Sequence, residues 1–359
     1  MSTESTSAAS RAPVRQLLRR LWRCGATGAF LVVVALQLAL FAAPWFWIGE
    51  ILQDLRWHFG LASSATAFAL LLARTPRRAS LALLLAAFHL WPEARLSWPV
   101  EPADATSPRV VLVTANVLFS NGNQAALLDA LRATRADVLA LQELTPPLRR
   151  LLERELGELP HRAFSPAEAW PEEGAGLGLF SRTPLREVRS LGLTVSYAPG
   201  LEAALDTPAG ALRLRVVHLQ RPGKPWRLAQ RGQGLAHLEG LDWAERDVLL
   251  GDLNLTPSAP RFAHLLERTE LRDSLVGHGR QPSYWRFPRL PRTFGVPIDH
   301  VLHGSALRAA AREVFELPGS DHGGVRVELV DAGTAPGVQA ARPGTGILLR
   351  PSRFAGASD

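Results

Sequence analysis

The sequence predicts an α/β protein in which two packed mixed β-sheets carry helices on their outer faces, preceded by an N-terminal helical transmembrane region. Beyond residue 108, short apolar runs typical of buried strands alternate with amphipathic helical segments, and strands outnumber helices. Several predicted strands follow one another closely enough to form hairpins, which favours mixed sheets over purely parallel ones. Long apolar runs before residue 92 predict the transmembrane region.

Three apolar runs occupy residues 25–92. The first, Gly25–Ile48, is long enough to span a bilayer and contains the aromatic residues 45–47 near its end, which are typical of a membrane interface. The second, Trp57–Ala73, is of marginal length, and the third, Ala79–Trp91, is short enough to be re-entrant. A cleaved signal peptide is the alternative for the first run, and the two later runs weigh against it.

Arginines predict the orientation of these runs. Residues 1–24 form a basic N-terminus with five arginines, and three more arginines lie in residues 74–78. The positive-inside bias therefore predicts that both segments are cytoplasmic, so three spans place the chain after about residue 92 outside the cytoplasm. If the third run does not span the membrane, the same bias predicts a cytoplasmic domain.

The net charge of +7 is concentrated in this N-terminal region. Residues 1–100 contain ten arginines and four acidic residues, which leaves 30 basic and 29 acidic residues in the rest of the chain. A near-neutral C-terminal region argues against a protein that binds DNA through a generic basic surface.

The stretch from Pro92 to Pro108 contains four prolines among charged residues and predicts a linker over residues 93–108. The domain expected over residues 109–330 contains helices at 124–134, 147–156, 225–243 and 260–268. Strands are expected at 109–116, 137–142, 176–181, 185–195, 202–206, 211–219, 248–251, 298–303, 308–316 and 324–330. Residues 331–359 are rich in Gly, Pro, Ala and Ser and predict a disordered tail.

The predicted site is centred on the stretch Val248–Pro257, whose apolar strand stops at Gly251. Asp252 and Asn254 follow two residues apart, so an extended backbone places both side chains on the same side. The carboxylate can orient or deprotonate a water, and the amide can donate to an oxygen that gains negative charge. By itself the pattern is more typical of a turn with a capping residue.

Three other predicted strands end on polar residues, namely Asn116, Glu143 and His218, and further polar residues lie at or just before the start of two later strands, namely Asp299, His300, Asp321 and His322. Each could cap a helix or form a turn, but together they lie where open α/β sheets assemble their sites. Such oxygen donors suit a hard divalent cation such as Mg²⁺. Cys24 is the only cysteine, so the chain contains no disulfide and no cysteine-based zinc site.

Seven motifs in this order resemble the endonuclease/exonuclease/phosphatase superfamily, which has the DNase-I-like fold. They are Thr-Ala-Asn-Val at 114–117, Asp-Val-Leu-Ala-Leu-Gln-Glu at 137–143, Gly-Leu-Phe-Ser-Arg at 178–182, Val-His-Leu at 217–219, Gly-Asp-Leu-Asn at 251–254, Ile-Asp-His-Val at 298–301 and Ser-Asp-His at 320–322. The resemblance covers about residues 108–330, and the N-terminus resembles a bacterial subgroup with several spans before the catalytic domain. It predicts a multi-pass protein of the bacterial inner membrane with an extracytoplasmic catalytic domain.

The resemblance implies a four-layered α/β sandwich and phosphoester hydrolysis that depends on Mg²⁺ or Mn²⁺. The metal residues would be Glu143 as principal ligand, Asn116 beside it and Asp321 as an assisting group. The catalytic residues would be His218 at the phosphate, Asp252 at the attacking water, Asn254 at a non-bridging oxygen and His322 as an acid/base or charge-stabilising group oriented by Asp299. His300 and His303 are expected to be structural.

One departure from the family pattern bears on the substrate. Leu118 stands where the abasic-site endonucleases of the family carry an aspartate, which argues against a DNA-repair role. The bilayer anchor and the near-neutral domain favour a lipid-linked or small phosphoester, and arginines and aromatics in residues 280–292 suit its recognition. A nuclease acting on DNA or RNA is the first alternative. An inactive, membrane-tethered binding module is the second.

Overall fold

The computed structural model describes residues 5–41, 47–104, 106–166, 175–193, 200–285 and 290–333. These residues fall into two compact units, one ending at Glu93 and the other beginning at Ala94. We call them the helical unit and the α/β unit. Except for residues 331–333, the predicted disordered tail lies outside the described residues.

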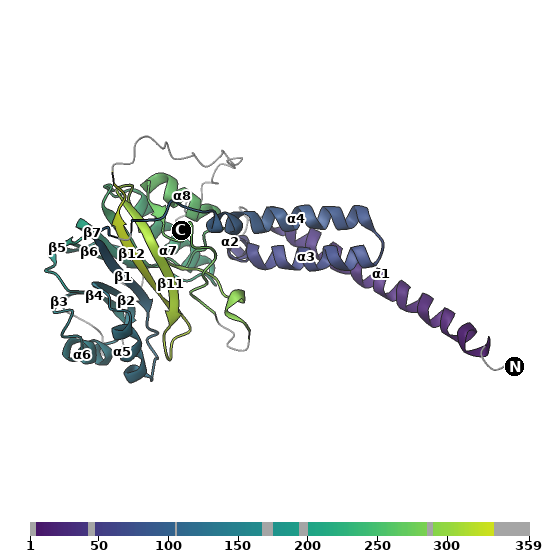
Figure 1. Cartoon of the computed structure of the whole chain (residues 1–359), viewed down its shortest axis with the longest axis horizontal. Coiled ribbons are helices and arrows are strands. Elements are labelled where there is room, and N and C mark those ends of the chain that lie inside the picture. Colours follow the sequence, from purple (N-terminus) through teal and green to yellow (C-terminus); the bar gives the residue numbers. More distant parts are fainter. Residues whose placement is uncertain are drawn as a thin grey trace, which may run out of the picture. The chain divides into compact units, whose positions relative to one another are not determined.

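The helical unit consists of four helices (Figure 1): α1 (Ser5–Phe41), α2 (Trp47–Asp54), α3 (Arg56–Leu72) and α4 (Pro76–Ala94). Small side chains dominate its buried cluster, which contains Ala26, Ala67, Leu70, Ala73, Ala79 and Ala82. Small residues let helix backbones approach one another closely, as they do between membrane helices. Helix α2 and the arginine-rich first part of α1 were not predicted from the sequence.

One helix among the described residues is long and apolar enough to cross a membrane, namely the part of α1 from Arg15 to Leu40, with a mean hydropathy of 1.7. Helix α3 has only 17 residues. Helix α4 has 19 residues but contains Arg77, Arg78 and Glu93, which are costly in a bilayer core. The described residues therefore provide one candidate span, and the second and third spans stay predictions.

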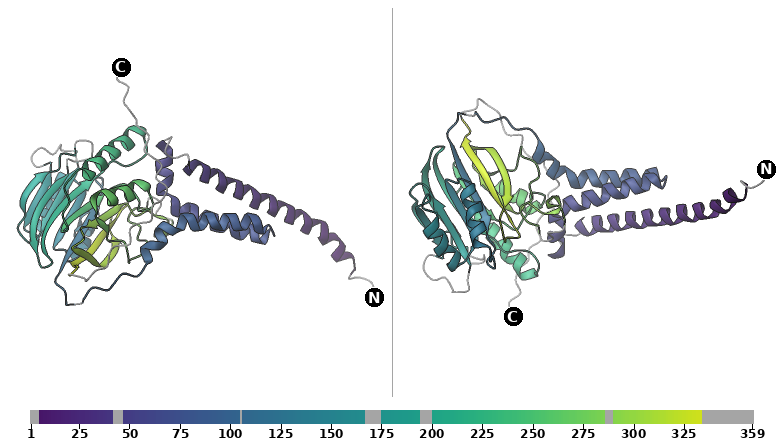
Figure 2. Two further views of the ribbon diagram at one scale, coloured as in Figure 1. Left: turned by 90° about the horizontal axis from the view of Figure 1, so that it is seen from above. Right: turned by 60° about the horizontal axis from the view of Figure 1, so that its bottom comes forward.

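The α/β unit contains two six-stranded mixed sheets, whose strands can also be followed in Figure 2. Sheet A has the order β11-β12-β1-β2-β4-β3, and sheet B has the order β5-β6-β7-β8-β10-β9. The strands of sheet A are β1 (Arg109–Asn116), β2 (Val138–Leu144), β3 (His161–Ser165), β4 (Gly176–Ser181), β11 (Leu307–Glu316) and β12 (Gly323–Asp331). Those of sheet B are β5 (Arg186–Ser190), β6 (Leu201–Thr207), β7 (Gly210–His218), β8 (Asp247–Asp252), β9 (Arg272–Asp273) and β10 (Asp299–His303).

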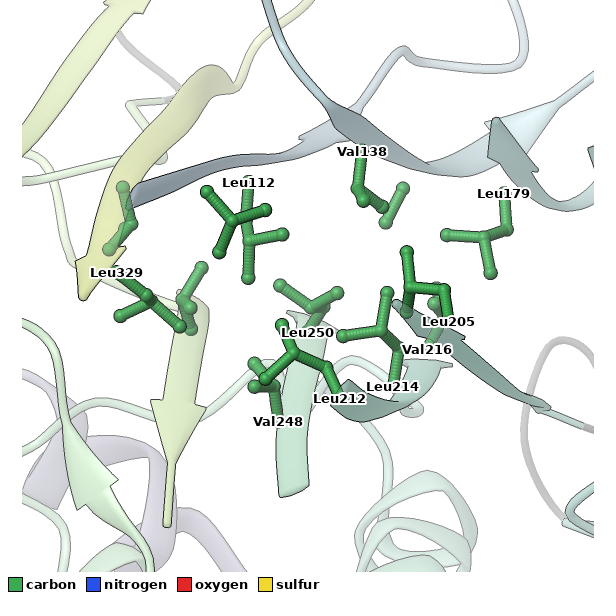
Figure 3. Close-up of a cluster of buried hydrophobic side chains, with 14 of the residues drawn as sticks. Leu112, Val138, Leu179, Leu205, Leu212, Leu214, Val216, Val248, Leu250 and Leu329 are labelled. Atoms are coloured by element: carbon green, nitrogen blue, oxygen red, sulfur yellow. The ribbon is translucent and has the colours of Figure 1, made fainter. Parts of the chain in front are cut away.

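Three apolar cores show that the α/β unit has four layers. Side chains from both sheets form the central core, which includes Leu112, Val138, Leu214 and Leu250 (Figure 3). A second core lies between sheet A and helices α5 (Gln124–Ala133) and α6 (Pro146–Glu155). A third lies between sheet B and helices α7 (Pro225–Glu239) and α8 (Pro260–Thr269). The predicted fold of two packed mixed sheets flanked by helices is confirmed.

Local sequence accounts for most of these elements. The strands β4 and β8 are buried along their whole length, which matches their nearly uninterrupted apolar sequences. Helices α6, α7 and α8 each begin with a proline in the first turn, where a missing N–H costs no helical hydrogen bond. The sequence analysis missed β3 and β9. It placed a linker over residues 93–108, whereas α4 continues to Ala94 and a 3₁₀ helix, η2, follows at Arg95–Ser97.

Candidate active site

Strand directions bring the polar strand ends together. Strands β1 and β2 are parallel, and so are β7 and β8, so each pair ends at one edge of its sheet. Within sheet B, His218 pairs with Asp252, and Asp252 pairs with Asp299 of the antiparallel β10. Strand β12 runs antiparallel to β1, so the residue before it, His322, lies near the end of β1.

Sheet A contributes Asn116 and Glu143. The Asn116 Nδ2 donates to Glu143 Oε1 at 3.2 Å and to Asp252 Oδ2 at 3.2 Å, so this amide joins the two sheets. The other carboxylate oxygen of Glu143, Oε2, accepts the N–H of Phe119 at 3.0 Å. Glu143 has a φ of 57°, a left-handed conformation that is unfavourable for a residue with a Cβ. Its side chain is 21% exposed, so the carboxylate can still receive a ligand from solution.

Sheet B contributes Asp252 and Asn254 through a tightly constrained turn. Gly251 has a φ of 139°, and a Cβ there would lie 2.0 Å from the carbonyl oxygen of Val217, so only glycine fits. The Asn254 N–H then donates to Asp252 Oδ1 at 2.8 Å, which fixes the carboxylate. The Asn254 Nδ2 donates to the Leu219 carbonyl at 2.9 Å, and an amide has a second N–H hydrogen to offer.

Two imidazoles face Asp252. His322 Nδ1 lies 2.8 Å from Asp299 Oδ2, and its Nε2 lies 3.9 Å from Asp252 Oδ2. His218 Nε2 lies 3.5 Å from the same Asp252 oxygen and 4.0 Å from Glu143 Oε1. The ion-pair geometry of His322 with Asp299 places its proton-bearing Nδ1 on the carboxylate and directs Nε2 toward the cluster centre.

The site groups have strongly perturbed pKa values. Burial and the nearby Asp299 carboxylate raise the pKa of Asp252 to about 8. Burial opposes ionisation of His322, but the charge of Asp299 and the hydrogen bond to it raise the pKa of His322 to about 9. Burial likewise opposes ionisation of Asp299, but the charge and hydrogen bond of His322 lower its pKa. Burial and the charge of His322 lower the pKa of His218 to about 3. In the absence of a ligand, His322 and Asp299 are thus an ion pair, and His218 is neutral.

The cluster could hold a metal ion. Among the described residues, Asp252, Asp299 and His322 place ligand atoms within 4.8 Å of one another. Because Asp299 and His322 already bind each other, the partly exposed Glu143 carboxylate is the more accessible ligand. All donors here are carboxylate, amide or imidazole groups, which fit a hard divalent cation better than a soft one.

Two of the predicted metal residues have less direct support in the geometry. Asn116 turns its amide nitrogen, not its oxygen, toward the two carboxylates, while its Oδ1 accepts the N–H of Leu118 at 3.1 Å. As a metal ligand it would need the opposite amide orientation. Asp321 acts on the site through its charge, which raises the pKa of His322. Both assignments stay predictions.

Further residues that the sequence analysis did not single out support the site. The Ser283 hydroxyl accepts the N–H groups of Ile298 and Asp299 at 3.1 and 3.0 Å and is fully buried. The Tyr284 ring centroid lies 4.9 Å from that of His322. Ser320 donates to the Asn116 carbonyl at 2.8 Å, which ties the His322 loop to β1. These contacts form between segments that are distant in the sequence. The Ser-Tyr pair in the arginine-rich stretch 280–292 is the one local feature that could have directed attention to this segment.

His300 and His303 contact backbone. His300 Nε2 lies 2.9 Å from the Leu255 carbonyl oxygen, and His303 Nδ1 lies 3.0 Å from that of Gly304. Both side chains are buried, and burial lowers the pKa of each. Their contacts therefore stabilise strand β10 and the turns beside it.

Residues 113–322 match the Endonuclease/Exonuclease/phosphatase family, and the chain belongs to this family. Members of the family are in general hydrolases that act on phosphoester bonds, and they typically depend on a divalent metal. Membership agrees with the observed fold and with the polar residues at the strand ends.

Solved structures similar to the chain include an endonuclease/exonuclease/phosphatase from Beutenbergia cavernae, with 22% identity over 62% of this chain and 72% of that one, and a TM-score of 0.48. An endonuclease/exonuclease/phosphatase from Bacteroides vulgatus matches at 16% identity over 62% of this chain and 99% of that one, with a TM-score of 0.49. Sphingomyelinase C from Streptomyces griseocarneus matches at 16% identity over 62% and 99%, with a TM-score of 0.45. The family assignment rests on the sequence match over residues 113–322.

Proposed function

We propose that this protein is a membrane-anchored phosphoester hydrolase, a phosphodiesterase or phosphatase, that depends on Mg²⁺ or Mn²⁺. The main observation behind the proposal is that polar residues at the strand ends of sheet A lie next to those of sheet B. Asn116 donates from β1 to both Glu143 and Asp252, and His322, paired with Asp299, faces the same Asp252 oxygen. Such a group combines a metal-binding carboxylate, a base and a charge-stabilising imidazole.

Glu143 would hold the cation, with Asn116 and Asp321 as neighbouring groups. Its partly exposed carboxylate is oriented by the Phe119 N–H and by the Asn116 amide. A bound divalent cation supplies positive charge that stabilises the phosphate oxygens in the transition state.

Asp252 would orient or deprotonate the attacking water. Its Oδ1 is held by the Asn254 N–H, which leaves Oδ2 facing the centre of the site. The side chain is 1% exposed, so little bulk water competes for this oxygen. Fixing a carboxylate before the substrate binds lowers the cost of reaching a reactive geometry.

The remaining groups would stabilise the negative charge that develops on the phosphate. His322 Nε2 and the second amide hydrogen of Asn254 are donors, and Asp299 keeps the His322 ring in one orientation. His218 Nε2 lies beside both Asp252 and Glu143, where it can contact a phosphate oxygen.

Glu143→Gln tests the proposal, and Glu328→Gln is a matched control. Glu328 lies on β12 with a side-chain exposure of 17%, close to the 21% of Glu143. The full chain in detergent should hydrolyse one member of a panel of phospholipid, sugar phosphate, DNA and RNA when Mg²⁺ is present. The Glu143 variant should lose this activity and the Glu328 variant should keep it.

Each result of that panel bears on an alternative. Hydrolysis restricted to DNA or RNA would favour the nuclease, and binding without turnover would favour the tethered binding module. Undiminished activity of Glu143→Gln, or of the wild type in excess EDTA, would contradict the metal assignment.

We also propose that the catalytic domain is extracytoplasmic and that the protein is multi-pass. The arginine distribution favours this topology, and the one candidate span among the described residues, in α1, supports a membrane anchor. Alkaline phosphatase fused after Val100 should be active in a bacterial host, and a green fluorescent protein fused at the same position should be dark. The reverse pair of results would contradict three spans.

A further inference from the structure

Three segments of the α/β unit are joined by hydrogen bonds near its first residues. The carbonyl of Leu96, in η2, accepts the N–H groups of Gly277 and Gly279 at 2.8 and 3.0 Å. Arg280 then donates to the carbonyl of Thr293 at 2.8 Å and to that of Gly295. Residues 95–100, 276–280 and 292–295 therefore form one continuous surface.

This surface exposes large apolar side chains. Trp98, Val100, Val276 and Phe294 have exposed fractions between 42% and 60%. The Val100 side chain also contacts Gly277, whose φ of 88° lets the two segments approach closely. Four large apolar groups gathered from three joined segments favour a binding surface over isolated exposed residues.

The same surface is basic. Its three segments contain Arg95, Arg280 and Arg292 and no acidic residue. The described acidic partner of Arg292 is Glu316, at 3.1 Å, and Arg292 also stacks on Trp285 at 4.3 Å. Guanidinium groups among aromatic and aliphatic side chains are the composition of surfaces that bind the headgroup layer of anionic membranes.

The chain itself leads to this surface from a membrane-like region. Arg95 directly follows α4, which is the last helix of the helical unit. The same unit contains the candidate span, in α1. Only a few residues separate Trp98 from α4, and tryptophan is enriched at membrane interfaces.

We propose that this surface, formed by residues 95–100, 276–280 and 292–295 and called here the interfacial surface, rests on the headgroup layer of an anionic bilayer. The proposal depends on the membrane anchoring proposed above. The apolar side chains enter the boundary between headgroups and acyl chains, and the exposed Arg95 and Arg292 bind lipid phosphates. The second segment continues into Ser283 and Tyr284, which contact Asp299 and His322, so the bound surface lies next to the active site.

A fluorescent probe at Val276 tests the contact, and Val188 offers a matched control. The two valines have exposed fractions of 43% and 47%. Val188 lies on β5, and Val276 follows β9, so they lie at opposite edges of sheet B. In the full chain with Cys24→Ser, either Val276→Cys or Val188→Cys is labelled with the environment-sensitive dye NBD and reconstituted into vesicles of phosphatidylcholine and phosphatidylglycerol.

The expected result is a blue-shifted emission at position 276 that brominated lipid quenches, with neither effect at position 188. Vesicles of phosphatidylcholine alone, or high salt, should weaken the quenching at 276 because they remove or screen the lipid charge. Equal quenching at both positions, or a blue shift at 276 without quenching, would overturn the proposal. The second of these results would mean that protein covers the surface.

Vesicle flotation separates this proposal from the one on which it rests. If the labelled protein does not float with the vesicles, the membrane anchoring is wrong and the interfacial surface fails with it. If it floats and position 276 is not quenched, only the interfacial surface fails. Neither readout depends on hydrolytic activity.

Discussion

Two buried charge clusters of the α/β unit differ in how their charges are compensated. The first, which we call the arginine network, lies on sheet B and contains Arg213, Arg215, Glu202 and Asp247. The second, the strand-end cluster, contains Asp252, Asp299, His218 and His322. Apart from Arg213, whose side chain is 31% exposed, both clusters are nearly inaccessible to solvent, so burial alone does not distinguish a structural cluster from a candidate catalytic one.

In the arginine network each carboxylate faces a guanidinium. Arg215 Nε donates to Glu202 at 2.7 Å, and its guanidinium carbon lies 4.0 Å from the ring centroid of Trp243. Burial opposes ionisation of Glu202, but hydrogen bonds from Arg215 and Arg189 lower its pKa. Such a network keeps both signs of charge satisfied and holds β6 and β7 together.

In the strand-end cluster two carboxylates share one charged imidazole. His322 compensates Asp299, while burial and the nearby Asp299 charge raise the pKa of Asp252. Ionising the buried Asp252 carboxyl group costs stability, and this group lies beside the partly exposed Glu143. Because both clusters are buried, the balance of charge is what distinguishes the strand-end cluster from the arginine network.

Asp252→Asn should give the largest effect on kcat and should distinguish the strand-end cluster from the arginine network most clearly. If Asp252 acts on the attacking water, kcat should fall by about 10²–10⁴-fold with little change in KM. The melting temperature should not fall, because the substitution replaces a carboxyl group whose ionisation is opposed by burial and by Asp299 with an uncharged amide. Steady-state kinetics and thermal melting measured together would expose the alternative, in which Asp252 only caps a turn and its loss lowers stability by about 1 kcal/mol with turnover intact.

His322→Ala should also lower kcat by about 10²-fold or more, because it removes a donor that acts in the transition state. Asp299→Asn should cost less, since it disturbs the orientation of the imidazole without removing it. The Asp252→Asn, His322→Ala double variant should lose much less than the product of the single losses, because both groups serve one step. Multiplicative losses would show that the two groups act in separate steps.

Arg215→Met should show the opposite behaviour. Removing this guanidinium leaves Glu202 buried without its main partner, so the free energy of unfolding should fall by about 3–5 kcal/mol. The activity per folded molecule should stay at the wild-type level. Denaturant unfolding and steady-state kinetics should both be measured on this variant. A fall in kcat with an unchanged free energy of unfolding would contradict the structural role of the arginine network.

The smallest expected effect concerns acid stability. Because the pKa of Glu202 is lowered in the folded state, its ionised form stabilises the protein above its ordinary pKa of 4.5. This contribution is lost as the pH falls through the lowered value. Arg215→Met should therefore reduce the loss of stability between neutral and acidic pH, which melting curves over that range would measure.

Much of this molecule could be predicted where the signal is local. The bounds of β1 and β4 follow from their apolar runs, and polar residues indicated the ends of β1, β2, β7 and β8. Strand β9 has only two residues, and β3 contains His161 and Arg162, so neither carries an apolar pattern.

Other features depend on contacts between distant segments. The support that Ser283 gives to Asp299, and the packing of Tyr284 on His322, arise only when β10 and β12 are in place. The bond of Leu96 to Gly277 and Gly279 is equally non-local, and it explains why residues 95–100 belong to the α/β unit instead of a free linker. The left-handed conformation of Glu143 leaves no mark on its own sequence.

The central claim is that Glu143 holds a divalent cation beside Asp252, the proposed base. Mn²⁺ binding measured by electron paramagnetic resonance tests this claim most directly. We predict saturable binding to the wild type that Mg²⁺ displaces, loss of this binding in Glu143→Gln, and retention in Glu328→Gln, whose side chain is equally shielded outside the site. If the Glu143→Gln variant bound Mn²⁺ as tightly as the wild type does, Glu143 would not be the metal ligand and the central claim would be wrong.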